Sequence, residues 1–335
     1  MLDEAPTLAR GGRSGLRGLR GAAVVSVGAS LPARVVANAE IAARIGKDEE
    51  WIYARTGIRE RRHAEPHERL ADHATAAARV ALDRAGIDPA ELDLVLVGTM
   101  TADELMPNAA PLVAHALGAE RAGAADIGAA CTAFLSALAL GVAQIEAGRA
   151  EHVLVVGADF ISRIVDHHSK ATAMLFADGA GAVVLAPVPG GGRIAPVLLR
   201  ADGSQADVLR AGRDERIVEM DGHETFKHAV NRMSEITLEA VAAADLELGE
   251  VDLFVYHQAN GRILKAVAER LGLDEARVVD CIERTGNMSA ATLPHALAVA
   301  HDDGRLRDGA RVLLSAFGGG FTWGGAVVEW GRGDG

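Results

Sequence analysis

The feature that most constrains the fold of this chain is a series of short, continuous apolar runs separated by longer Ala-rich segments. Most of the short runs consist of Val and Leu and lack the polar alternation of a half-exposed strand. Continuous apolar strands are typical of sheets that are covered on both faces. Helices rich in Ala and Gly can pack closely against such sheets. The pattern therefore predicts an α/β protein with buried sheets and layered helices. Strands are expected over residues 22–28, 92–100, 152–159, 181–188, 253–258, 310–318 and 325–330, and helices over 71–86, 131–148, 229–244, 261–272 and 291–304.

Two segments of the chain can be laid over two later ones without gaps, which indicates an internal duplication. The segment that starts at Ala81 matches the one that starts at Ala240, and residues 131–148 match residues 287–304. The shared Ala and Leu content accounts for part of this match. A duplication predicts two pseudo-symmetric halves, with Cys131 and Asn287 at equivalent strand-to-helix turns. The expected organisation is a disordered tail over 1–21, an N-terminal half over 22–190 and a C-terminal half over 191–335, with the linker near 187–193.

Length and composition exclude several classes of protein. With 335 residues, 49% of them apolar and 24% charged, the chain has the length of two domains and is mostly not intrinsically disordered. A formal net charge of −12 argues against a nucleic-acid surface built on bulk charge. No apolar run approaches the ~20 residues that span a bilayer, and the N-terminus lacks the apolar segment of a secretory signal. Two cysteines do not make a disulfide framework, so we expect a reduced, cytoplasmic protein without membrane contact.

Cys131 is the first candidate for chemistry. It follows a short apolar run and begins a strong helical pattern, in DIGAACTAFLSALALG. Unsatisfied backbone N–H groups and the helix dipole favour the thiolate, which is the nucleophilic form. The alternative, a buried structural cysteine, is equally common at such a position. Cys281 lacks this setting and is expected to be a core cysteine.

Two further residues lie where active-site clefts form in α/β proteins. His257 ends a predicted buried strand, in LFVYHQAN, and Asn287 opens a helix, in RTGNMSAATLP. A structural histidine and a helix N-cap are the simpler interpretations of each. The glycine-rich segment 316–325 joins two predicted strands, so it is not a phosphate loop, but its N–H groups could contribute to an oxyanion hole.

Other catalytic classes fit less well. A papain-like hydrolase also uses Cys, His and Asn, but its cysteine motif and secretion signal are absent from this sequence. The histidines near residues 166–168 and 223–228 lack the frame of a metal site, so no metal is expected.

Several motifs together resemble the β-ketoacyl-[acyl carrier protein] synthase III family. They are GAACTAF around Cys131, YHQANGRI around His257, GNMSAATLP around Asn287 and FGGGFTWG near the end. DEEWIYARTGIRERR and FADGAGAVVL match this family too, in order and with suitable spacing from about Ala22 to Trp330. The resemblance implies the thiolase fold, a five-layered αβαβα arrangement of two halves, and a homodimer.

The resemblance also implies a reaction and the residues that perform it. Cys131, His257 and Asn287 would form the catalytic triad, and the N–H groups of Cys131 and Gly319 the oxyanion hole. An acyl group from acyl-CoA, which is a substrate and not a cofactor, would move onto Cys131. Malonyl-acyl carrier protein would then lose carbon dioxide, and His257 and Asn287 would stabilise the enolate that attacks the acyl-enzyme.

The resemblance assigns the remaining contacts by position. For CoA it implies Trp51, Arg55, Arg163 and Asn260, where an indole and a guanidinium offer stacking faces for adenine. For the acidic carrier protein it implies a local basic patch of Lys227, Arg262, Lys265 and Arg270, although Glu269 stands where the family often has a basic residue.

The primer pocket is where this sequence departs from the well-known acetyl-specific members. Thr132 and Ala133 follow the nucleophile where the usual run is Ala-Gly, and Met106 replaces a phenylalanine that closes the partner's acyl pocket in those enzymes. Phe317 resembles a family phenylalanine near the triad. These changes predict a primer other than acetyl, in fatty-acid or polyketide synthesis.

Two alternatives share this fold. One is an acyltransferase that moves the acyl group from Cys131 to an oxygen or nitrogen acceptor, and the other is a non-catalytic scaffold subunit. The presence of His257 and Asn287 disfavours the first, and the presence of Cys131 disfavours the second. A thiolase is disfavoured because its second catalytic cysteine is absent at the expected end of the chain.

Overall fold

The computed structural model describes residues 20–333, and the earlier part of this range forms a five-stranded sheet in the order β1-β7-β6-β4-β5. Strand β4 is parallel to both of its neighbours, whereas β7 is antiparallel to both of its own. Its central strands are continuous apolar runs, and all of β6 is buried, as the sequence predicts for a sheet covered on both faces. The strands are β1 (Arg20–Ser30), β4 (Leu94–Gly98), β5 (Gly123–Ile127), β6 (Val153–Phe160) and β7 (Asp178–Pro189).

A second, four-stranded sheet follows in the order β11-β12-β13-β8. Strands β11 and β12 are parallel, and β13 is antiparallel to β12 and β8. Its strands are β8 (Leu198–Ala201), β11 (Leu253–Tyr256), β12 (Arg311–Gly318) and β13 (Thr322–Glu329).

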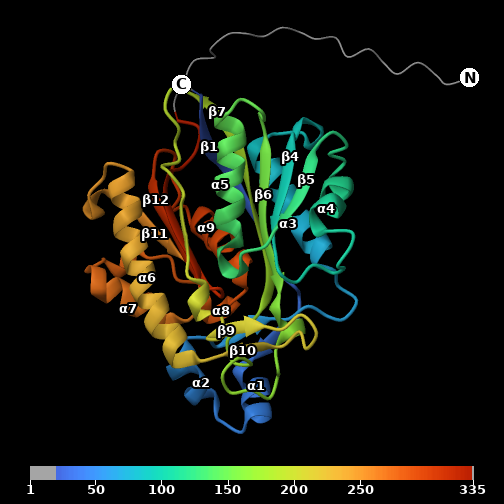
Figure 1. Ribbon diagram of the computed structural model, residues 1–335, viewed down its shortest axis with the longest axis vertical. Helices are drawn as coiled ribbons and strands as arrows, with labels where there is room; N and C mark the ends of the chain where they lie inside the picture. Colours follow the sequence, from blue (N-terminus) through green and yellow to red (C-terminus); the bar gives the residue numbers. More distant parts are fainter. Residues whose placement is uncertain (1–19, 334–335) are drawn as a thin grey trace, which may run out of the picture.

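Two buried helices, α5 (Ala133–Glu146) and α9 (Thr292–Asp302), lie between the sheets (Figure 1). Helices α3 (Leu70–Ala85) and α4 (Ala109–Leu117) cover the outer face of the first sheet, and α6 (Gly222–Ala243) with α7 (Gly261–Leu271) lies outside the second. One apolar cluster joins α5, α9 and the facing strands of both sheets. The layers therefore follow the αβαβα order that the resemblance implies.

Short 3-10 turns precede both central helices. Turn η2 (Ala130–Thr132) leads into α5, and turn η7 (Ser289–Ala291) leads into α9. The two turns contact one another, and each contacts the sheet of the other half. They therefore lie where the two halves meet.

Smaller elements gather at one end of the molecule, around the carboxyl ends of β11 and β12 (Figure 1). They are β2 (Val35–Ala37), α1 (Asn38–Ile45), α2 (Glu49–Thr56), β3 (Glu60–Arg62), β9 (Leu209–Ala211), β10 (Val218–Met220) and α8 (Ile282–Thr285).

Every predicted strand and helix forms, and the elements that the pattern did not predict are mostly short or rich in small residues. The predicted tail over 1–21 is too long by two residues, because Arg20 and Gly21 pair with β7; residues 1–19 lie outside the described part. Within residues 20–333, no helix is both long enough and apolar enough to cross a membrane.

Candidate active site

Cys131 lies in turn η2, just before the first residue of α5. The preceding Ala130 has a positive φ of 47°, which bends the chain sharply into the helix. The Cys131 side chain is buried, and its Sγ accepts a hydrogen bond from the Ser289 hydroxyl at 3.4 Å. Burial raises the pKa of the Cys131 thiol to about 12. Burial acts against the thiolate that the helix N-terminus would favour, so the expectation of a reactive thiolate at Cys131 stays a prediction.

His257 follows the last residue of β11, at the carboxyl end of a buried strand. Its backbone N–H donates to Ser315 O at 2.8 Å, which continues the pairing of β11 with β12. Its Nδ1 lies 2.5 Å from Thr292 Oγ1, and its Nε2 has no hydrogen-bond partner among residues 20–333. Burial lowers the pKa of His257 to about 3, so the imidazole is neutral.

Asn287 is fixed in a loop between α8 and turn η7. Its N–H donates to Leu175 O at 2.9 Å, and its carbonyl accepts from Ala177 N at 2.8 Å. Its Oδ1 accepts from Ser289 N at 2.9 Å, and its Nδ2 lies 3.4 Å from Ala259 O. The backbone donor at Oδ1 sets the orientation of the amide, so that Nδ2 is the group left to face a ligand.

Cys131, His257 and Asn287 border one cavity of about 330 Å³. It is lined on one side by α6 and on the other by α2 and the start of α7. Predicted residues Arg55, Asn260, Arg262 and Phe317 also line it. The structure thus brings the predicted triad together with part of the predicted CoA-binding set.

A second cavity of about 540 Å³ also reaches Cys131. Ser289 and Gly319 border it beside the sulfur, and Ile161, Ile164 and Phe176 give it apolar walls. Its outer part is formed by Leu105 and by the segment that joins β9 to β10. Cys131 therefore lies between two cavities, of which the second is the larger.

The glycine-rich segment packs directly on the nucleophile. A Cβ at Gly318 would lie 2.8 Å from the backbone N of Cys131, so only glycine fits at the end of β12. The next residue, Gly319, borders the second cavity together with Cys131. This placement fits the predicted oxyanion hole of the Cys131 and Gly319 N–H groups, which remains a prediction.

Trp51 and Arg55 stack on each other on α2. The Arg55 guanidinium lies 4.0 Å from the centre of the Trp51 ring, and Lys47 Nζ lies 5.2 Å from it. Asn260 Nδ2 donates to Arg55 O at 3.1 Å, which joins this pair to the start of α7. An adenine that stacks between Trp51 and Arg55 would therefore have to open an existing cation–π contact.

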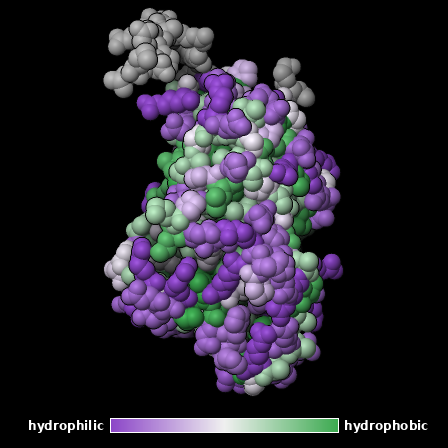
Figure 2. All heavy atoms as spheres, turned by 90° about the vertical axis from the view of Figure 1, so that its right-hand side faces the viewer, coloured by the Kyte–Doolittle hydropathy of each residue, from purple (hydrophilic) through white to green (hydrophobic). Residues whose placement is uncertain are grey.

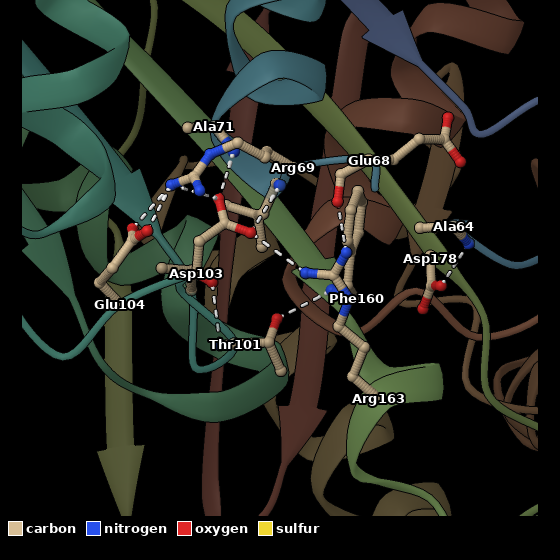
Figure 3. Close-up of polar contacts among 12 residues, drawn as sticks. Ala64, Glu68, Arg69, Ala71, Thr101, Asp103, Glu104, Phe160, Arg163 and Asp178 are labelled. Atoms are coloured by element: carbon tan, nitrogen blue, oxygen red, sulfur yellow. Dashed lines mark hydrogen bonds and ion pairs between the residues drawn. The ribbon is translucent and has the colours of Figure 1, made fainter. Parts of the chain in front are cut away.

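Arg163 does not belong to this group and lines neither cavity, so its predicted contact with CoA gains no support from the geometry and stays a prediction. Its guanidinium stacks on Phe160 at 4.8 Å, donates to Asp103 Oδ1 at 3.1 Å and bonds to the Glu68 carbonyl (Figure 3). Asp103 also accepts the first N–H groups of α3, from Leu70 and Ala71. Arg163 thus holds the loop after β4 against α3, with one hydrogen bond from each terminal nitrogen.

A second basic residue of the same segment lies next to a residue that lines the first cavity. Lys170 precedes Ala171, which lines the first cavity, and its side chain is exposed. Family spacing alone did not distinguish it from Arg163.

Two predicted primer-pocket residues lie outside both cavities. The Thr132 hydroxyl donates to Ala129 O and lies 2.8 Å from Thr322 Oγ1, so it ties turn η2 to β13 and does not reach a pocket. Met106 is 85% exposed beside Leu105 and does not line its own chain's cavity. Phe317 is buried, lines the first cavity and packs on Phe321 with ring centres 4.6 Å apart.

The predicted carrier-binding residues are spread along α6 and α7. Arg262 lines the first cavity and lies 5.5 Å from the Phe226 ring. Lys227 and Lys265 form exposed ion pairs with Glu224 and Glu269. Arg270 bonds to Asn231 on α6, in the last turn of α7, away from the cavity-lining residues. Only Arg262 of this set borders the cavity.

Sequence reasoning missed the polar residues that hold the triad. Ser289 has a positive φ of 50°, and its groups contact Cys131, Asn287 and Thr292. Asp159, at the end of β6, is buried and accepts from Ala290 N at 3.2 Å and from Met100 N at 2.9 Å. The only sequence signal was their presence within or beside the quoted motifs.

Comparison with known proteins agrees with this geometry. The model of the 3-oxoacyl-[acyl-carrier-protein] synthase III family matches residues 125–220, and that of its C-terminal part matches residues 241–330. A Rhodospirillum rubrum protein named β-ketoacyl-[acyl-carrier-protein] synthase III is 44% identical, over 91% of this chain and 98% of its own. A Vibrio cholerae protein named β-ketoacyl-[acyl-carrier-protein] synthase III 1 is 41% identical, with the same coverage of 91% and 98%.

Solved structures of similar proteins have the same fold as this chain. The synthase III of Thermus thermophilus superposes with a TM-score of 0.89 at 42% identity, covering 93% of this chain and all (100%) of that one. The priming β-ketosynthase of the R1128 polyketide pathway superposes with a TM-score of 0.91 at 37% identity, covering 95% and 99%. The predicted thiolase fold is confirmed. With this identity over nearly its whole length, the chain belongs to the β-ketoacyl-[acyl carrier protein] synthase III family.

Proposed function

We propose that this protein is an acyltransferase that condenses an acyl-CoA primer with malonyl-[acyl carrier protein] and so begins a fatty-acid or polyketide chain. The observation that carries the proposal is the convergence of Cys131, His257 and Asn287 on one cavity, with a second cavity behind the sulfur. The names of its relatives support the same reaction class.

In the first half-reaction, Cys131 Sγ attacks the acyl-CoA carbonyl carbon. The S–acyl bond to Cys131 forms, the bond to the CoA sulfur breaks, and the thiol proton ends on that sulfur. The buried thiol starts protonated, so the N–H groups beside Cys131 must stabilise the oxyanion that develops during transfer. The acyl chain lies in the second cavity and the pantetheine arm in the first.

In the second half-reaction, the malonyl thioester loses carbon dioxide. The electron pair of the broken C–C bond moves into an enolate, whose oxygen is held by His257 Nε2 and Asn287 Nδ2. The enolate carbon then attacks the acyl carbonyl, and Cys131 Sγ leaves and takes up a proton from solvent. Two neutral donors suit this step, because they stabilise the developing charge without a counterion. The scheme uses no cofactor or metal.

Intact-mass measurement tests the proposal directly. The protein is incubated with a panel of acyl-CoAs, then with malonyl-[acyl carrier protein], and both proteins are weighed. We expect an acyl increment on the enzyme that disappears as a β-ketoacyl increment appears on the carrier. Transfer of the intact acyl group to a hydroxyl or amine acceptor, without loss of carbon dioxide, would support the alternative acyltransferase.

The size of the second cavity favours a primer larger than acetyl. In the single chain this space of about 540 Å³ has apolar walls at Ile161, Ile164 and Phe176, and its lining also includes Arg210, Arg213 and Arg216, so it has room for more than a two-carbon chain before a second copy covers it. Leu105 lies at its outer end and the neighbouring Met106 is exposed, where a second copy of the chain would receive it. An unbranched thioether can move aside where a phenyl ring would block.

Substitution of Met106 checks this primer assignment. Met106→Phe should raise the ratio of kcat/KM for acetyl-CoA to that for a six-carbon acyl-CoA by about 10- to 200-fold, the usual range for crowding an apolar pocket. An unchanged ratio would show that Met106 does not shape the pocket of either copy.

The homodimer is part of the proposal. Strand β5 is the edge strand of the first sheet, and the nearby Leu105 and Met106 are 82% and 85% exposed. Figure 2 shows the face on the side of β5 and α4, where hydrophobic residues lie between hydrophilic ones. An open edge beside exposed apolar side chains favours pairing with a second copy.

The proposed CoA and carrier contacts are chosen from predicted or neighbouring residues at the first cavity. Trp51, Arg55 and Asn260 remain the proposed CoA residues, and Lys170 takes the place of Arg163 in the proposal because it adjoins the first cavity. Arg262 and Lys227 are the proposed carrier contacts nearest the cavity. We place the enzyme in the cytoplasm, a reducing compartment that suits its two free cysteines.

A further inference from the structure

Thr292 is the first residue of α9, and its side chain contacts His257 Nδ1. Within residues 20–333, this is the only ring nitrogen of His257 that has a hydrogen-bond partner. Its Oγ1 lies 2.5 Å from His257 Nδ1 and 2.9 Å from the carbonyl oxygen of Ser289. Thr292 and His257 are both buried, so water does not compete for this contact. A hydroxyl has one proton, and it can therefore donate to only one of these two acceptors.

The Ser289 carbonyl does not need the hydroxyl. The backbone N–H of Thr292 already donates to Ser289 O, which closes turn η7. When the hydroxyl turns to His257, the carbonyl keeps a partner and no buried polar group is left unpaired. In this arrangement Thr292 donates across the 2.5 Å contact to Nδ1; in the alternative arrangement Nδ1–H donates to Oγ1 and the hydroxyl donates to Ser289 O.

The direction of this bond decides where the ring proton lies. Burial lowers the pKa of His257 to about 3, so the ring is neutral and has a single N–H proton. If that proton were on Nδ1, Nε2 would turn a lone pair toward the cavity and would repel the thioester oxygen. If Nδ1 accepts from Thr292, the proton is on Nε2 and can be donated to that oxygen.

We infer that Thr292 is a positioning residue of the condensing site, whose hydroxyl donates to His257 Nδ1 and keeps the ring proton on Nε2 for the enolate oxygen. The inference rests on the proposed role of His257. It has a consequence for the first half-reaction, because an Nε2 that already carries a proton cannot accept the Cys131 thiol proton. Acylation of Cys131 is therefore independent of Thr292, and decarboxylation depends on it.

The ring proton can be observed without any substrate. The full-length protein is labelled with ¹⁵N-histidine, and the His257 resonances are assigned by their absence in His257→Gln. We expect a protonated Nε2 and an unprotonated, hydrogen-bonded Nδ1 in the parent and in Thr292→Ser. In Thr292→Val the Nδ1 resonance should shift because it loses its donor. A protonated Nδ1 in the parent overturns the inference.

The half-reactions supply the functional arm. Thr292→Val should slow decarboxylation of the malonyl thioester by about 10- to 100-fold, less than removal of a direct donor costs, while acylation of Cys131 stays within a few-fold of the parent. Thr292→Ser should restore most of the decarboxylation rate. Equal decarboxylation in the parent and Thr292→Val, or no recovery in Thr292→Ser, would contradict the inference.

A matched control separates the hydroxyl from packing. Thr75 is also buried in a helix, and its hydroxyl donates to the Ala71 carbonyl at 2.7 Å and, among the described residues, to no histidine. Thr75→Val should leave both half-reactions unchanged. If Thr292→Val fails to fold, the inference is still tested by the position of the His257 ring proton in the parent spectrum and by the decarboxylation rate of Thr292→Ser. If His257→Gln decarboxylates as fast as the parent, the proposed function of His257 fails, whereas the parent spectrum still shows whether Thr292 donates.

Discussion

Turns η2 and η7 are built alike but do different chemistry. Each precedes a buried central helix, and each begins with a non-glycine residue at positive φ, namely Ala130 at 47° and Ser289 at 50°. Turn η2 presents a sulfur atom to two cavities, whereas turn η7 and its flanks present hydrogen-bond donors. Two turns of similar backbone conformation therefore have different roles. Turn η2 holds the atom that forms the bond, and turn η7 with its flanks holds groups that stabilise charge.

Each turn rests on a glycine of the other half. A Cβ at Gly318 on β12 would lie 2.8 Å from Cys131 N, and a Cβ at Gly157 on β6 would lie 2.2 Å from Ala290 O. Both contacts are with backbone atoms, which cannot move aside as a flexible side chain can. The halves therefore fix each other's turns, and this explains how residues from two halves reach one cavity without a flexible loop.

The largest expected effect comes from removing the atom that turn η2 presents. Cys131→Ala should abolish condensation, a loss on the order of 10⁶ by analogy with the removal of other nucleophiles, because no acyl-enzyme forms. Decarboxylation of malonyl-[acyl carrier protein] should persist, since its donors come from the other turn and from β11. Carbon dioxide release and product formation are measured in parallel, with Cys281→Ala as the control of unchanged activity. Condensation by Cys131→Ala would refute the assignment.

Removing a hydrogen-bond donor to the enolate should have the opposite effect, with decarboxylation slowed and acylation of Cys131 largely kept. Asn287→Ala or His257→Ala should slow decarboxylation by ~10²–10³, because one preorganised donor to the enolate is lost. Acylation of Cys131 should change far less, which time-resolved intact mass can follow. Asn108→Ala is the control, since Asn108 makes no side-chain cap at α4 and lies outside both cavities. If decarboxylation matched the parent, the roles given to these two residues would be wrong.

A smaller effect is expected from crowding turn η2 without touching its sulfur. Gly318→Ala places a methyl group 2.8 Å from Cys131 N, so the turn must shift and the nucleophile with it. A displacement of about 1 Å at a reacting group costs on the order of 10² in rate. Gly128→Ala is the control, because its Cβ would meet nothing within 4 Å. We expect slower acylation in Gly318→Ala alone; equal acylation rates in both variants would show that the close approach has no role in reactivity.

The smallest expected effect is on the pH dependence of stability, through His295 on α9, the helix that follows turn η7. Burial lowers the pKa of His295 on α9 to about 4, so the unfolded chain binds a proton there more readily than the native state below pH 6.5. Its contribution to stability is therefore present above pH 6.5 and is lost as the pH falls toward 4, by about 2 kcal/mol at pH 5. The free energy of unfolding is measured with urea at pH 7 and at pH 5. Between these two pH values, His295→Gln should lose less of this free energy than the parent, by the same amount. The same loss in both proteins would show that His295 does not titrate in this way.

The sequence predicted the layers because its strong signals are local. Continuous Val and Leu runs identify buried strands such as β6 and β12 whatever surrounds them. Strand β5 was not predicted, because GAADI has small residues and lies at the sheet edge, where burial does not select Val or Leu. The motifs likewise identified Cys131, His257 and Asn287, since each has a recognisable position relative to a strand or helix end.

What the sequence could not supply are contacts between distant segments. The ungapped match pairs Cys131 with Asn287, yet the structure pairs Ala130 with Ser289 as first residues of the two turns, so Cys131 corresponds to Ala290. Arg163 has the right residue type for CoA, but Phe160 and Asp103 hold it elsewhere. These outcomes depend on which side chains face each other across layers.

The central claim is that the two turns serve separable half-reactions, and one experiment on Asn287→Ala tests it most directly. The variant is mixed with acyl-CoA and malonyl-[acyl carrier protein], and the acyl adduct is located by peptide mass mapping while carbon dioxide is collected from the same sample. The account predicts an acyl group on Cys131 at nearly the parent's occupancy, with carbon dioxide release reduced by ~10²–10³. An adduct on Cys281 with Cys131 free, or release of carbon dioxide at the parent's rate, would contradict it.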